Sequence, residues 1–160
     1  MPGSLPVPDS VLRALEREAE ERGSTPEAVM VGMLLRLVEP GERPRALLEA
    51  AHMSLEHARA LAEEGRLGEA FRRVWASVLL GLDALGYLRG GGRPEGLAGY
   101  WGLVSEAMGE VGSVADAWYA GLAAFVAFRE GVGDERHFGA MVGRVERFLE
   151  ELGGRVAGGV

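Results

Sequence analysis

The stretch VWASVLLGLDALGYL, residues 74–88, decides the fold of this 160-residue chain. Its large apolar residues lie on most sides of a helix rather than along one stripe, which is typical of a helix at the centre of a protein. We predict a single helix from about Gly68 to Arg89. The run is shorter than the roughly 20 apolar residues that a bilayer span needs, and Asp83 interrupts it. The pattern therefore predicts a core helix and no membrane association.

Apolar spacing and capping residues predict six further helices around this one. They cover about 10–22, 26–38, 45–64, 95–111, 116–130 and 135–152. The only strand signal is LPV at residues 5–7, and prolines flank it. The sequence thus predicts an all-α, up-and-down helical bundle over 44–152, with an N-terminal helical pair over 1–43 and a disordered tail over 153–160.

The composition excludes some kinds of site and disfavours others. There is no cysteine, which excludes disulfides, thiolate metal sites and cysteine nucleophiles. The net charge is −7, whereas most nucleic-acid-binding proteins present a basic face to phosphates, so nucleic-acid binding is not expected. The start MPGSLPVPDS has neither the basic nor the apolar region of a signal peptide, and we predict a cytoplasmic protein.

Polar groups that could carry chemistry are few. Glu49 and His52 have the Glu-x-x-His spacing of a di-iron bundle, but no second copy of the motif follows, so no metal or other cofactor is expected. The glycines of the loop RGGGRPEG, 89–96, lie between arginines that could hold a phosphate, but no strand or P-loop ending accompanies them, and a hinge is the favoured interpretation. Asp83 would be a functional candidate if buried, but we predict that it lies at the water-facing edge of its helix.

The N-terminal segment resembles a ribbon-helix-helix DNA-binding module, with proline, a helix, Gly-Ser-Thr-Pro-Glu and a second helix. The strand of such a module would be LPVP, in which two prolines remove ladder hydrogen bonds and no side chain can read a base. Residues 1–39 contain four arginines against seven acidic residues. We therefore expect the helical pair to pack on the bundle or on a second subunit rather than on DNA.

Two further motifs carry a broader resemblance. One is a glycine turn before a Trp-containing, alanine-rich helix, within 54–85, and the other is a Trp-containing helix that ends in Phe-x-Glu-Gly, within 115–131. Together with 5–43, these stretches resemble the PaREP family of archaeal helical proteins over about residues 5–150. The resemblance implies a fold related to the HEPN domains, which are helical bundles that often dimerise and include many ribonucleases.

The stretch LAAFVAFREG, residues 122–131, departs from the family pattern. Where that pattern has His and Asn, this chain has Phe125 and Ala127. Arg129 is followed by His137 with seven residues between them, a longer spacing than in the HEPN ribonucleases. The departure predicts a protein without catalytic activity.

The residues singled out on this basis fall into two groups. The candidate polar site consists of Asp116, Tyr119, Arg129 and Glu130, and the aromatic residues expected in the core or at a dimer interface are Trp75, Trp118, Phe125 and Phe128.

The resemblance and the apolar helices together imply a HEPN-like homodimer that acts by protein association, in a toxin–antitoxin or stress-response setting, with a further protein partner as an option. The alternatives are a HEPN-type ribonuclease with a rearranged site and a DNA-binding regulator that uses the N-terminal segment.

Overall fold

The computed structural model describes residues 4–158 and shows helices joined by turns, with no strand in that range. The predicted all-α class and bundle architecture are confirmed. The elements are α1 Asp9–Arg22, α2 Pro26–Leu34, the short 3₁₀ helices η1 Leu35–Leu37 and η2 Pro40–Glu42, α3 Arg43–Glu63, α4 Leu67–Leu88, α5 Gly96–Ala107, α6 Val114–Glu130 and α7 Glu135–Ala157.

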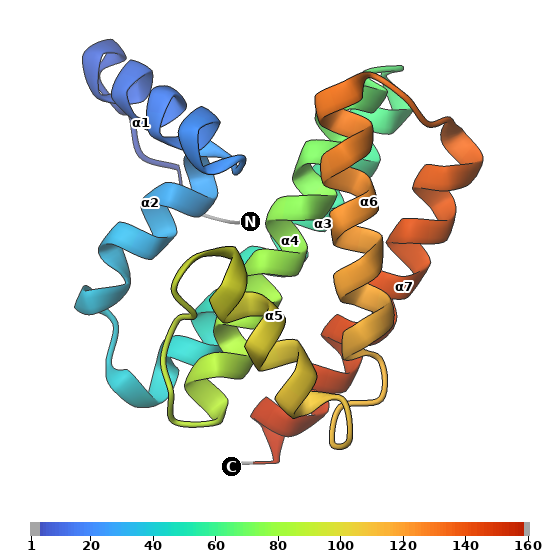
Figure 1. Ribbon diagram of the computed structural model, residues 1–160. Coiled ribbons are helices and arrows are strands. Elements are labelled where there is room, and N and C mark those ends of the chain that lie inside the picture. The colour runs from blue at the N-terminus through green and yellow to red at the C-terminus, as the bar shows by residue number, and fades with distance from the viewer. Residues whose placement is uncertain (1–3, 159–160) are drawn as a thin grey trace.

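The central helix of the bundle is α4, which packs against α3, α5, α6 and α7. Figure 1 shows α6 and α7 side by side on one flank of α4. Every residue from Leu80 to Gly86 is buried, as the apolar composition of this helix predicts. Ser77 is also buried, and its hydroxyl donates to the carbonyl of Ala51 in α3 at 2.8 Å, so it needs no water.

The helices α1 and α2 form the N-terminal pair, which Figure 1 shows in blue beside the bundle. Gly23 ends α1 in the left-handed conformation, with φ of 64°. Thr25 then caps α2 by accepting from the backbone N–H of Ala28 at 3.2 Å. Glu27, in the first turn of α2, pairs with Arg73 of α4.

The N-terminal end of the chain agrees with the predicted all-α class, whereas the C-terminal end differs from the sequence prediction. Residues 5–7 form no strand, and α1 begins at Asp9 with Pro8 at its N-cap. The tail predicted to be disordered from Gly153 continues as helix to Ala157, while residues 159–160 lie outside the described residues. The helix continues because Leu152 is buried and Val156, one turn later, packs on the same core.

The start of α7 follows its capping signal. Asp134 accepts from the backbone N–H groups of Arg136 and His137, and the His137 Nδ1 accepts from the N–H of Asp134 at 3.1 Å. Among residues 4–158, none of the helices combines the length and the apolar character that a membrane crossing requires.

Candidate functional site: a cleft beneath the N-terminal helical pair

A cleft of about 610 Å³ lies between the N-terminal pair and the bundle, a size usual for small-molecule sites. We call it the α2–α4 cleft. Its walls are mainly apolar, and they are formed by Ala28 and Val29 of α2, Trp75, Leu79 and Leu80 of α4, and Pro94, Leu97 and Tyr100 from the loop before α5 and from α5 itself. Trp75, Leu79 and Asp83 are spaced four residues apart, so one stripe of α4 forms the floor.

The polar centre of the cleft is Asp83, whose exposed fraction is only 2%. One carboxylate oxygen accepts from the Tyr100 hydroxyl at 2.6 Å, and the other accepts from the Nε of Arg93 at 3.1 Å. Burial raises the pKa of Asp83 to about 6, although the Arg93 charge and the two hydrogen bonds oppose the rise. The prediction that Asp83 faces water is therefore wrong, because α5 and the preceding loop cover it.

The loop after α4 brings Arg93 to Asp83. The N–H of Gly91 donates back to the carbonyl of Gly86 at 3.0 Å, and that of Gly90 donates to Tyr87 at 3.0 Å. The carbonyl oxygen of Gly92 lies only 2.1 Å from the position that a Cβ on Gly86 would occupy. The loop is thus folded against the end of α4 by defined contacts, and its role as a hinge stays a prediction.

Arg93 also reaches across the cleft to α2. Its Nη1 lies 2.5 Å from where a Cβ on Gly32 would be, so the guanidinium rests against the backbone of that helix. Burial lowers the pKa of Arg93, but the neighbouring Asp83 carboxylate and the Tyr100 hydroxyl together raise it further, so the pKa is raised overall and the guanidinium stays charged. One side chain therefore connects the buried carboxylate of α4 with the wall formed by the N-terminal pair.

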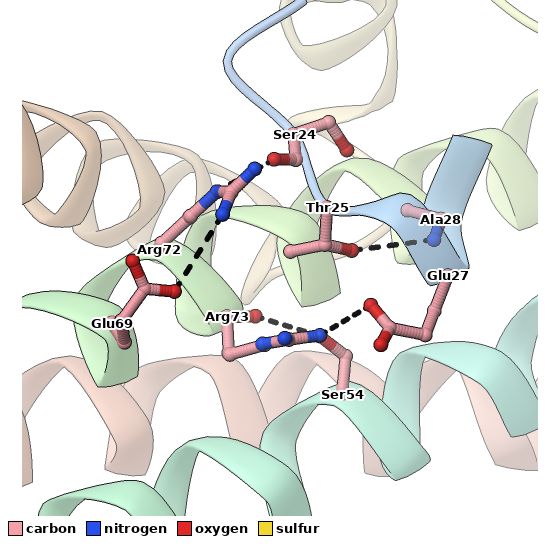
Figure 2. Close-up of polar contacts among 8 residues, drawn as sticks. All are labelled: Ser24, Thr25, Glu27, Ala28, Ser54, Glu69, Arg72 and Arg73. Carbon is pink, nitrogen blue, oxygen red and sulfur yellow. Dashed lines mark hydrogen bonds and ion pairs between the residues drawn. The ribbon is translucent and has the colours of Figure 1, made fainter. Parts of the chain in front are cut away.

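Two arginines of α4 hold the N-terminal pair in place (Figure 2). The Nε of Arg72 donates to the carbonyl of Ser24 at 2.7 Å, and the guanidinium of Arg73 pairs with Glu27. Arg72 is itself held by Glu69 at 3.6 Å, within the same helix. These contacts fix the turn between α1 and α2 and so determine the width of the α2–α4 cleft.

The candidate polar site predicted on α6 does not form one cluster. Asp116 and Tyr119 are exposed near the start of the helix, while Arg129 and Glu130 are exposed at its end, about 15–21 Å away at 1.5 Å per residue. The guanidinium of Arg129 lies over the ring of Phe125, 5.5 Å from its centroid. The four side chains therefore cannot act together on one small substrate.

The aromatic residues predicted for the core or a dimer interface do converge. Trp118 is fully buried, and its ring centroid lies 5.6 Å from that of Trp75, which in turn lies 5.3 Å from Phe125. Phe128 is half-buried beneath the Arg72 guanidinium. These rings pack within one chain, and their part in a dimer stays a prediction.

The histidines form no metal site in the part of the chain that the structure describes. His52 and His57 are exposed on α3, and His137 is engaged in the cap of α7. No group of three potential ligands is found between Ser4 and Gly158.

Sequence reasoning missed Tyr100 as a functional candidate, set Arg93 aside in favour of a hinge in its loop, and placed Asp83 in water. The available signal was the position of Asp83 on the Trp75 stripe of an otherwise buried helix, followed by a loop that carries an arginine. Comparisons of the chain with protein-family models, with curated proteins and with solved structures give no match.

Proposed function

We propose that this protein is a non-catalytic binding protein whose ligand is a small molecule held in the α2–α4 cleft. The observation that carries the proposal is the combination of apolar walls with one buried, hydrogen-bonded charge network at the floor. Ligand sites usually consist of an apolar concavity with a few convergent polar groups, one of which has a shifted pKa. Arg93 supplies such a polar group, and Asp83 and Tyr100 hold it in place from beneath.

Native mass spectrometry of the purified protein tests this proposal. We expect a small-molecule adduct, which Leu97→Trp removes because the larger ring occupies the mouth of the cleft. Val126→Trp on α6 is the matched control, since the two residues are 55% and 52% exposed and Val126 does not line the cleft. Once the ligand has been removed from the unaltered protein, a compound that forms the same adduct should raise the Tm of that protein by roughly 5–10 °C when it is added at 100 times its Kd.

The proposal fails if the unaltered protein carries no adduct and no member of a broad small-molecule library raises its Tm. It also fails if Leu97→Trp and Val126→Trp retain the same adduct to the same extent, because the ligand would then lie elsewhere.

We further propose that the chain self-associates through the N-terminal pair, as the resemblance to dimeric HEPN-like and PaREP proteins implies. What supports this is that α2 is apolar on nearly all sides, a composition typical of a fully buried helix, yet Met33 and Leu34 are exposed. Leu37 in η1 is exposed next to them. A second copy of this surface would cover these side chains, and a toxin–antitoxin or stress-response role would act through that association.

Light scattering coupled to size-exclusion chromatography measures this association. We expect twice the chain mass for the unaltered protein, and a single chain mass for Met33→Glu, because a buried unpaired charge is costly at an interface. Met53→Glu on α3, at a similarly exposed methionine, should leave the dimer intact. A monomer at micromolar concentration for the unaltered chain would contradict the proposal.

A further inference from the structure

Most of the donor capacity of Arg93 is unused in the α2–α4 cleft. A guanidinium has five N–H donors, and the hydrogen bond to Asp83 uses only the one on Nε. Within residues 4–158, Arg93 makes no hydrogen bond to another carboxylate or to a carbonyl oxygen, and the remaining polar neighbour of its guanidinium is the Tyr100 hydroxyl. The side chain is 36% exposed and lines the cleft, so these donors are accessible to a bound molecule.

A second donor in the wall of the cleft also lacks an acceptor. Trp75 is only 5% exposed, and its indole N–H is buried with no hydrogen-bond partner in the described part of the chain. Buried donors are nearly always paired, and an unpaired one needs an explanation. Because this N–H has almost no surface exposed to the cleft, the donors that a ligand can reach are those of Arg93, and they favour a ligand that presents acceptors.

Among the charged groups that line the cleft, Arg93 is the principal cation available to a ligand. Asp83 is buried and accepts from both Arg93 and Tyr100, so it is not accessible to a ligand. Arg22 at the rim is paired with Glu18 at 2.7 Å. Glu95 is also at the rim, exposed to water, and is the one carboxylate that would compete for a cationic ligand.

From this arrangement we infer that the ligand of the α2–α4 cleft is an amphipathic anion, a carboxylate or phosphate joined to an apolar body. The head group accepts from the η nitrogens of Arg93, whose planar fork matches such oxygens. The body lies along Val29, Leu79 and Leu97, which have no polar group to offer. This inference rests on the proposed function and names the chemistry of its ligand.

Isothermal titration calorimetry with four probes of one chain length tests the inference: decanoate, decyl phosphate and decylammonium, each below its micelle concentration, and decanol below its solubility limit. We expect the two anions to bind roughly 10-fold or more tightly than decanol, because a hydrogen bond to a charged group is lost in the alcohol. The stronger of the two anions identifies the head group.

Variants of Arg93 assign the effect to that side chain. Arg93→Gln should lower the affinity for the two anions roughly 10-fold or more and leave the affinity for decanol unchanged. The affinity of Arg93→Lys for the anions should lie between those of Arg93→Gln and the unaltered protein, since lysine keeps the charge but not the planar fork of donors. Arg89→Gln, at the other end of the same loop and paired with Glu110 outside the cleft, is the matched control and should bind as the unaltered protein does. Unchanged decanol binding shows that Arg93→Gln is folded.

The possible failures are distinguishable. Equal binding of decanol and decanoate, or tighter binding of decylammonium, overturns the anion inference and leaves the proposed binding function in place. Absence of binding by all four probes to a protein that carries an adduct overturns the inference alone. Absence of probe binding, of an adduct and of any library compound that raises Tm overturns the inference and the proposed function together.

Discussion

Replacement of Gly86 by alanine is expected to destabilise the protein by about 3 kcal/mol, at the upper end of what overpacking usually costs. A Cβ at this position would lie 2.1 Å from the carbonyl oxygen of Gly92 and 3.2 Å from its carbonyl carbon. Both are backbone atoms, so no rotamer change relieves the clash and the whole loop must move. Because that loop carries Arg93, the hydrogen bond to Asp83 and the shape of the cleft are lost with it.

Chemical denaturation of Gly86→Ala and Gly102→Ala measures this effect. Gly102 is a helical glycine in α5 with open space where its Cβ would be, so alanine there should stabilise the protein by about 0.5–1 kcal/mol. The two identical substitutions should therefore change the free energy of unfolding in opposite directions. A Gly86→Ala variant that is as stable as the unaltered protein, and binds ligand equally well, would contradict the described loop.

Asp83→Asn is expected to abolish a pH dependence of stability that the buried carboxyl creates. The pKa of Asp83 is raised from 3.8 to about 6 in the folded protein, so between these values the folded state binds the proton more strongly than the unfolded state. The stability that Asp83 contributes is then complete below pH 3.8 and is lost as the pH rises through 6. The loss amounts to about 3 kcal/mol, at 1.36 kcal/mol per pKa unit.

Denaturation of both proteins at several pH values between 4 and 8 isolates this contribution, because all other carboxyl groups titrate in both. We expect similar stability at pH 4, where the protonated acid and the amide have nearly the same shape, and an advantage for Asp83→Asn of up to about 3 kcal/mol at pH 7.5. A stability difference that is constant across this range would show that the folded protein does not shift the Asp83 pKa.

The helix ends were predictable where the signal is local. Gly23, Thr25, Pro26 and Asp134 each act through the conformation or hydrogen bonds of the residues next to them, and the observed helices begin or end there. The end of α7 was not predictable in the same way. The glycines at 153 and 154 favour a stop, but the burial of Leu152 and Val156 against other helices favours continuation, and tertiary packing prevails.

The α2–α4 cleft could not be predicted because its parts are far apart in the sequence. Asp83 is buried only because Tyr100 and Arg93 fold over it, and their positions depend on the path of the loop after Leu88. No sequence pattern within α4 predicts the path of that loop. The opposite wall comes from Ala28 and Val29, which reach the cleft through the contacts of Arg72 and Arg73 with the turn at Ser24.

The attachment of the N-terminal pair through Arg72, Arg73 and the Arg93 guanidinium has a thermodynamic consequence. A molecule that touches both α2 and α4 binds the docked pair more tightly than a displaced one, so it must shift the population of the pair toward docking by that difference in affinity. The coupling is reciprocal, and anything that holds α1 and α2 against α4 raises affinity for that molecule by the same factor. Occupancy of the cleft would thereby bias the position of α2, whose Met33 and Leu34 side chains are exposed.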